Sequence, residues 1–459
     1  MKLSARAKTQ RKFVKAPFGD VLAGILVFAV AILSGCVAPE RPTYNAAEAD
    51  RAQISGFENI RAHVDDPRPP VSVHDPWRPV ILKDKPTMLA ISGGGAGGAF
   101  AVGILSAWSE LGTRPRFAVV TGVSTGALIA PFAFLGSDYD AQLRRLYLSG
   151  ETRDLIDIEW KGAGIFSPGL LKGNALRSNV EQTITIEILR RIATEHRAGR
   201  RLLVMTTNLD TQRAVVWNIG AIAASNRPDA LALVRHILIA SASVPGIFPP
   251  VSIRAVVDGK QIEELHSDGG SSAQFFTLPE HLLVANNDHA KGQNLHIYVI
   301  VNNALIPEFS MSRERALPIM GRAYGILLKS QTKHGLVALY NFAQRSGVDL
   351  DIASIDEQVP YSMLNPLSVD YMRSVYRIGY KGILDRKLWV KRPVFRTPYG
   401  GVALTFGSLR RGFASRISGS YRASDFSPDR DGMSAKPAVV SCGEMFAMEM
   451  EKVGDWAMG

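Results

Sequence analysis

The chain has 459 residues, enough for one large domain or two smaller ones, and 46% hydrophobic and 21% charged residues, as in globular proteins. The net charge is +11, but the first 35 residues hold six Lys/Arg and one Asp, which leaves 47 basic against 41 acidic residues in the remainder. A small basic excess suits an anionic membrane surface. The sequence has no zinc-finger spacing or other nucleic-acid motif, so a nucleic-acid partner is not expected.

Residues 1–35 have the organisation of a signal peptide. Basic residues precede the apolar run Val21–Leu33, which is too short to span a bilayer but is typical of a secretory signal. Ser34 and Gly35 stand directly before Cys36 and resemble a bacterial lipobox. That resemblance implies cleavage before Cys36 and attachment of several acyl chains to it, which would anchor the protein to a membrane. An ordinary secretory signal or a signal anchor, with Cys36 incidental, is the alternative.

The lipobox also predicts where the protein resides. We expect a lipid-anchored protein of the bacterial cell envelope, and Val37, in place of an aspartate, favours the outer membrane, facing the periplasm. The only other cysteine is Cys442, so an acylated Cys36 leaves no internal disulfide.

The composition divides the remaining chain into three parts. Residues 36–84 are rich in Pro, Asp and Ala and are expected to form a tether and an N-terminal strap in which Trp77 packs on the domain. Residues 85–385 alternate short apolar runs with helical segments, which predicts an α/β fold with a mainly parallel sheet. Its expected strands are 87–92, 117–121, 201–207, 214–218, 251–257, 261–266 and 295–301, and its expected helices include 98–111, 125–135, 311–347 and 365–384.

The last part, residues 386–459, is predicted to be a basic tail with interleaved aromatic residues. Between Arg386 and Arg422 there are nine Lys/Arg and no Asp/Glu. We interpret it as a partly disordered or surface-wrapping segment. The alternative is a patch that contacts anionic lipid head groups.

Gly122-Val123-Ser124-Thr125-Gly126 follows an expected strand and opens an expected helix. A G-x-S-x-G turn in that setting exposes the serine hydroxyl at the tip of a strained turn, beside the positive end of the helix. Gly122 and Gly126 leave room for the strand and helix to approach closely. The motif therefore favours a serine nucleophile, and a structural glycine-rich turn is the alternative.

A second glycine-rich segment, Ser92 to Phe100, also lies between a strand and a helix. Gly93, Gly94, Gly95 and Gly98 allow backbone N–H groups to converge on an anion. A phosphate or dinucleotide loop would need a P-loop lysine or an acidic residue after the next strand, and neither is present. An oxyanion hole paired with the serine turn fits better.

The base that activates Ser124 is less obvious. None of the nine histidines stands in a recognisable catalytic setting, and His266 is expected to be structural. Asp268 ends an expected strand and is followed by Gly269 and Gly270, which permit a tight turn that directs the carboxylate inward.

Four segments in this order resemble the patatin-like phospholipase family: the triple-glycine loop, the G-x-S-x-G turn, Ala240–Pro250, and Asp268-Gly269-Gly270. The resemblance covers about residues 85–385. It implies a three-layer α/β/α sandwich with a mainly parallel central sheet. It also implies a Ser–Asp dyad, in which Ser124 attacks an ester carbonyl and Asp268 is the general base, without a cofactor or metal.

The implied substrate is a lipid ester, of which phospholipid is the main candidate, and the amides around Gly94 and Gly95 would bind the oxyanion. One position departs from the family, whose glycine loop commonly has a basic residue where this chain has Gly97. Two other hypotheses stay open. A triad esterase would need one of His281, His289, His296 or His334, and a non-catalytic envelope scaffold would need no activated serine.

Overall fold

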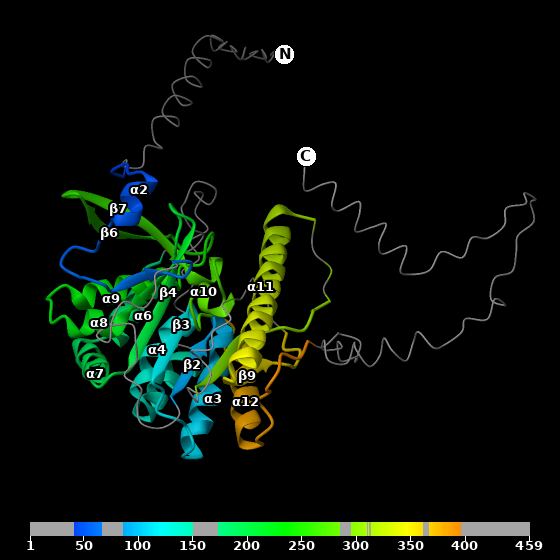
Figure 1. Ribbon diagram of the computed structural model, residues 1–459. Coiled ribbons are helices and arrows are strands. Elements are labelled where there is room, and N and C mark those ends of the chain that lie inside the picture. Colours follow the sequence, from blue (N-terminus) through cyan, green and yellow to red (C-terminus); the bar gives the residue numbers. More distant parts are fainter. Residues whose placement is uncertain are drawn as a thin grey trace, which may run out of the picture. The chain divides into compact units, whose positions relative to one another are not determined.

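The computed structural model shows an α/β fold built on one sheet (Figure 1). It describes residues 41–66, 86–149, 173–284, 295–309, 311, 314–360 and 367–395. The predicted signal peptide with Cys36, the strap residue Trp77, His289, Cys442 and nearly all of the basic tail lie outside these ranges.

Within the described residues the sheet has nine strands. Five adjacent strands at one end of the sheet are mutually parallel, and antiparallel strands extend it at the other end. Along the sheet the order is β1 (Arg61–His63), β5 (Arg213–Asn218), β4 (Arg201–Asn208), β3 (Val119–Val123), β2 (Thr87–Ile91), β8 (His296–Ala304) and β9 (Asp349–Ile355). The hairpin of β6 (Val251–Val257) and β7 (Lys260–Asp268) joins this sheet through β4.

Alternate side chains of the parallel strands pack into different hydrophobic clusters, including a small one around Val123, Leu203 and Met205. Leu89, Ile91 and Ile300 belong to a core shared with one set of helices. Ala90 and Val299 face the opposite core, which a single long helix covers. The first set contains α3 (Gly98–Glu110), α4 (Thr125–Leu135), α7 (Ile186–Arg197), α9 (Ala230–Ser241) and α12 (Val369–Leu384), and the long helix is α11 (Ala316–Ser346). Helices thus cover both faces of the sheet, and the predicted three-layer fold class is confirmed.

Shorter elements complete the described part: α2 (Ala46–Arg51), α5 (Asp140–Leu148), α6 (Asn174–Thr183), α8 (Ile219–Ala224), α10 (Glu280–Val284), and the 3-10 turns η1 (Gly95–Gly97), η2 (Ser137–Tyr139) and η4 (Gly269–Ser271). Among the described helices, none combines the length and the apolar character that crossing a membrane requires.

One edge of β4 is shared by two strands, and this arrangement creates the site. Residues 201–205 of β4 pair in parallel with β3, whose last residue Val123 lies opposite Met205. Residues 206–208 pair antiparallel with β7, whose last residue Asp268 lies opposite Thr206. Because β3 and β7 approach from opposite directions, their carboxyl ends meet beside adjacent residues of β4. The chain segments that follow Val123 and Asp268 therefore start next to each other.

Most sequence-based elements agree with the structure. The expected turn at Asp258-Gly259 joins β6 to β7, and both residues have positive φ, 50° and 79°, as a tight two-residue hairpin requires. The helix expected from 311 begins at Ala316. Two strands were not predicted from the sequence: β9, which pairs with β8, and β1, which pairs with β5.

Candidate active site

Ser124 lies in a strained turn between β3 and α4. Its φ is 56° and its ψ is −124°, an unfavourable conformation for a residue with a side chain. A Cβ atom at Gly122 would lie 2.4 Å from the carbonyl oxygen of Gly126, and one at Gly126 would lie 2.2 Å from that of Ile91. Both glycines are therefore required by close backbone packing. The turn places the hydroxyl at the N-terminal end of α4.

The hydroxyl of Ser124 donates a hydrogen bond of 2.6 Å to Oδ2 of Asp268. The other carboxylate oxygen, Oδ1, accepts from the backbone N–H of Gly270 at 2.7 Å, and the Thr207 hydroxyl donates to the carbonyl of Asp268. Gly269 has no room for a side chain, because its Cβ would lie 2.4 Å from the carbonyl oxygen of Met205. The carboxylate is thus held from two sides and directed at the serine.

Burial changes the acid–base properties of Asp268. Its side chain is 2% exposed, and loss of water raises its pKa to about 7, although the hydrogen bonds from Ser124 and Gly270 act in the opposite direction. A carboxylate with a pKa near neutrality is a stronger base than an ordinary aspartate and accepts a hydroxyl proton more readily.

The segment Ala240-Ser241-Ala242-Ser243, at the end of α9, connects the two halves of the dyad. The Ser241 hydroxyl accepts from the backbone N–H of Ser124 at 3.1 Å and donates to the carbonyl of Met205 at 2.7 Å. The carbonyl of Ser243 accepts from the backbone N–H of Asp268 at 2.9 Å. This motif, noticed in the sequence only as a resemblance, therefore fixes the backbone of both dyad residues.

The glycine loop lies next to the dyad. Gly93 donates its N–H to the carbonyl of Gln274, and its Cβ position is 3.2 Å from Cβ of Ser124. Gly94, with φ of 150°, and Gly95, with φ of 54°, form the turn that leads into η1 and α3. A Cβ atom at Gly98 would lie 2.5 Å from Oγ1 of Thr125. The loop and the first residue of α3 thus pack directly against the serine turn.

Comparison with known proteins agrees with this geometry. Residues 89–287 match the family model of the patatin-like phospholipases. This segment is a patatin-like phospholipase domain. It contains the glycine loop, Ser124 and Asp268, and a domain of this kind supports lipid acyl hydrolase activity.

No curated protein sequence matches the chain. Among solved structures, VipD from Legionella pneumophila is similar, with a TM-score of 0.35 and 12% sequence identity. The match covers 66% of this chain and 66% of VipD, slightly less than two thirds of the length of either.

Gly97, the departure of this patatin-like domain from its family, has a structural reason. A Cβ atom there would lie 1.9 Å from the carbonyl oxygen of Asn302 in β8, so no side chain fits. Asn302 itself binds the loop: its side chain donates to the carbonyl of Ser92 at 2.8 Å and accepts from the N–H of Ala101 at 3.2 Å. Asn303 donates to the carbonyl of Gly93. In this chain β8 orders the glycine loop directly.

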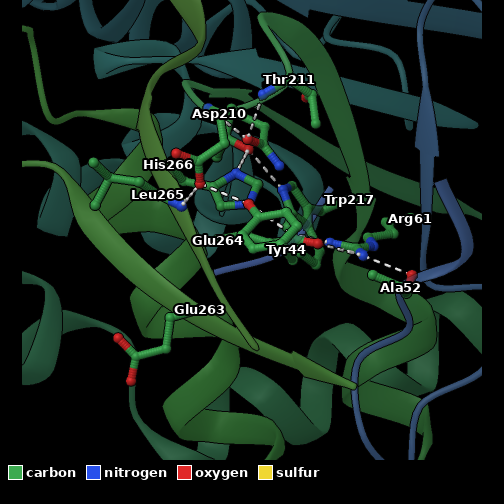
Figure 2. Close-up of polar contacts among 12 residues, drawn as sticks. Tyr44, Ala52, Arg61, Asp210, Thr211, Trp217, Glu263, Glu264, Leu265 and His266 are labelled. Carbon is green, nitrogen blue, oxygen red and sulfur yellow. Dashed lines mark hydrogen bonds and ion pairs between the residues drawn. The ribbon is translucent and has the colours of Figure 1, made fainter. Parts of the chain in front are cut away.

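His266 belongs to a buried polar network behind the dyad (Figure 2). Its Nε2 contacts the carboxylate of Glu264 at 3.1 Å, and its Nδ1 contacts the hydroxyl of Thr206 at 3.0 Å, which also accepts from the Trp217 indole. Arg61 pairs with the carboxylate of Glu264 and stacks over Trp217. Burial lowers the pKa of His266, which favours the neutral ring.

The charges of that network also favour a structural role for His266. Although burial opposes ionisation of Glu264, its contacts with His266 and the charge of Arg61 bring its pKa down to about 2. A neutral His266 that donates through Nε2 and accepts through Nδ1 satisfies every partner around it. The network connects β7, β4 and β5 with β1, and it supports the strands that end at the dyad.

The other histidines proposed for a triad are placed differently. His296 starts β8, opposite Thr87, whereas Ser124 follows the carboxyl end of β3, so the two lie at opposite edges of the sheet. Nε2 of His296 contacts Asp351 at 2.6 Å. His281 lies in α10 and His334 in α11, and the side chain that contacts the Ser124 hydroxyl is that of Asp268. This geometry favours the dyad over a triad.

Sequence reasoning missed several side chains that shape the site. Ser241 and Asn302 are buried polar residues whose partners lie far along the chain, and the buried Gln274 donates to the carbonyl of Gly270. Tyr324 reaches the turn after Asp268 from α11. Within the described residues, no group of three or more His, Cys, Asp or Glu side chains is arranged to hold a metal ion.

Proposed function

We propose that this protein hydrolyses acyl esters of lipids, phospholipids among them, with Ser124 as nucleophile and Asp268 as base. The observation that carries the proposal is the 2.6 Å contact between Ser124 Oγ and Asp268 Oδ2 in a buried site. The strained turn, the adjacent glycine loop and the raised pKa of Asp268 support the same chemistry.

The reaction follows from these positions. As Ser124 Oγ attacks the ester carbonyl, its proton passes to Oδ2 of Asp268, and the carbonyl oxygen becomes an oxyanion beside the N–H groups of Gly94 and Gly95. Collapse of this intermediate expels the alcohol, which takes the proton from Asp268 and leaves an acyl-serine. Water then attacks the acyl-serine with Asp268 again as base, and the fatty acid leaves while Ser124 regains its proton.

Labelling with a fluorophosphonate probe tests the dyad before any substrate is known. We expect wild type to react, Ser124→Ala not to react, and Asp268→Asn to react at least about 100-fold more slowly, because a general base contributes this much. His296→Ala and His334→Ala should label like wild type. Labelling of Ser124→Ala at the wild-type rate would contradict the assignment. A panel of phospholipids and lysophospholipids then defines the substrate.

We also propose that Cys36 carries lipid and holds the enzyme at the outer membrane, facing the periplasm. The support is the signal-like segment 1–35 with its lipobox, so the catalytic domain would work beside its substrate. Mass spectrometry of the mature N-terminus tests this. We expect a peptide that begins at acylated Cys36 and unprocessed protein for Cys36→Ser, whereas an unmodified mature N-terminus elsewhere would refute it.

A further inference from the structure

Helix α11 has two different halves. Its C-terminal half covers the sheet, where Leu336, Leu339 and Phe342 are buried in the second core. Its N-terminal half instead exposes large apolar side chains to solvent. With two residues from the segment before the helix, these form a surface that we call the apolar patch: Phe309, Met311, Ile319, Met320, Ile326 and Leu327, which are 52% to 88% exposed.

The apolar patch follows the helix period. Positions 319 and 326 are two turns apart, as are 320 and 327, so the two pairs of side chains lie on one broad side of α11. The segment before the helix is held against it, because Arg322 donates to the carbonyl of Glu308 and Lys329 pairs with the Glu308 carboxylate. Residues 306 and 308, and with them the neighbouring Phe309, therefore lie beside the N-terminal half of the helix.

The chain topology puts this patch at the catalytic edge of the sheet. Helix α11 connects the parallel strands β8 and β9, so it starts where β8 ends, at the edge where Ser124 and the glycine loop lie (Figure 1). The same helix half contacts the turn after Asp268. Gln331 donates to the carbonyl of Ser272 at 2.5 Å, and the Tyr324 hydroxyl interacts with Ser271.

Tyr324 shows how near that helix half lies to the dyad. Burial raises the pKa of Tyr324 to about 12, and the negative charge of Asp268 acts in the same direction. The half of α11 that carries the apolar patch thus also contacts the turn that follows Asp268.

The charge of α11 selects the kind of surface that can cover the patch. Across its 31 residues the helix carries four Lys/Arg and no Asp or Glu. Arg322 and Lys329 belong to the half that carries the patch, where both contact Glu308, whereas Lys333 lies over the Phe395 ring and Arg345 donates to the carbonyl of Leu283. A helix with basic residues and one apolar side has the composition of segments that lie in the interface of an anionic bilayer.

We propose that the apolar patch docks the enzyme on an anionic lipid bilayer and thereby brings the dyad to lipids still in the membrane. This inference rests on the proposed function, because docking serves catalysis only if the protein hydrolyses membrane lipids. The apolar patch would be a second membrane contact, independent of Cys36. The docked helix carries Tyr324 and Gln331, which contact the turn after Asp268.

A kinetic comparison tests the docking. In the full chain, Ile326→Gln/Leu327→Gln removes apolar surface while keeping helix-compatible, neutral side chains. We expect hydrolysis of phospholipid in phosphatidylcholine–phosphatidylglycerol vesicles to fall about tenfold or more, because two exposed apolar side chains lose their burial in lipid. Turnover of a soluble short-chain ester should change less than about twofold on this reasoning. The matched control is Ile186→Gln, an apolar residue exposed to 48% on α7, which should affect neither substrate.

A fluorescence measurement needs no catalysis. In the Ser124→Ala chain, with Cys36 and Cys442 replaced by serine, an environment-sensitive dye is attached at Leu327→Cys or, as control, at Ile186→Cys. Anionic vesicles should shift the emission to the blue only for the dye at 327. If neither substrate of the kinetic test is hydrolysed by wild type but this shift appears, the proposed function fails and the docking surface stands.

Three outcomes would overturn the docking proposal: no shift at 327, equal loss of vesicle and soluble-ester turnover in the double variant, or unchanged turnover of vesicle lipid. Light scattering adds a fourth. A wild-type dimer that the double variant converts to a monomer would mean that a second copy of the chain, and not lipid, covers the patch.

Discussion

Asp268→Asn should make the protein more stable above neutral pH, although it removes the proposed base. Burial raises the pKa of Asp268 from 3.8 to about 7, so between these values the folded chain keeps a proton that the unfolded chain has lost. The contribution of protonated Asp268 to the free energy of unfolding is therefore fully present below the unfolded pKa of 3.8 and is lost as pH rises through the folded pKa. The slope is about 1.4 kcal/mol per pH unit up to the folded pKa and falls to zero above it, so the loss between about pH 5 and about pH 8 is about 3 kcal/mol.

Asparagine has nearly the same shape, can accept from Gly270 and can donate to Ser124, but it does not titrate. The free energy of unfolding of Asp268→Asn minus that of wild type should therefore increase by about 3 kcal/mol from about pH 5 to about pH 8, while other titrating groups cancel. Urea unfolding at a series of pH values measures this difference.

Asp210→Asn is the matched control. Although burial acts in the opposite direction, hydrogen bonds from Arg41 and Tyr44 hold the pKa of Asp210 at about 2. Its stabilisation is lost only as pH falls through that value, so above about pH 5 this variant should differ from wild type by a constant amount. A constant difference for Asp268→Asn as well would refute the reasoning about its burial.

Three further predictions concern the same site. Because the base must be ionised, kcat/KM for a soluble ester should rise with pH with a midpoint near the Asp268 pKa of about 7, and a midpoint near pH 4 would contradict the raised pKa. Gly97→Ala should lower the midpoint of thermal unfolding and activity together, since its Cβ would lie 1.9 Å from the carbonyl oxygen of Asn302, and unchanged melting would exclude this contact. Ser241→Ala should cost about 1–3 kcal/mol in urea unfolding, because the buried carbonyl of Met205 loses its donor, and a change under about 0.5 kcal/mol would argue against that role.

The elements around the dyad were predictable because their signals are local. Glycines flanking a serine between a strand and a helix, or following an aspartate at a strand end, identify turns whose conformations only glycine-rich sequences allow. The Asp258-Gly259 hairpin was equally local. In each case the residues that determine the conformation lie within about ten positions of one another along the chain.

The long-range contacts that position the site residues were not predictable, because they depend on the order of the strands in the sheet. Asn302 meets the glycine loop only because β8 inserts beside β2, about 200 positions away. Similarly, β9 begins with Asp349-Leu350-Asp351, whose charged residues do not indicate a buried strand. Its pairing with β8 makes it a strand. Single-sequence patterns contain neither the register of these strands nor the partners of their polar side chains.

The shared edge of β4 positions Asp268, the proposed base, without a histidine. A strand that ends in the nucleophile and another that ends in the carboxylate meet there, so backbone pairing fixes the separation of the two groups. A triad uses its third group to orient a histidine ring, whereas here Gly270 N–H and the Ser243 carbonyl orient Asp268 directly. The carboxylate at this meeting point of β3 and β7 is buried, and burial raises its pKa. The arrangement of the strands therefore determines both the orientation and the basicity of Asp268.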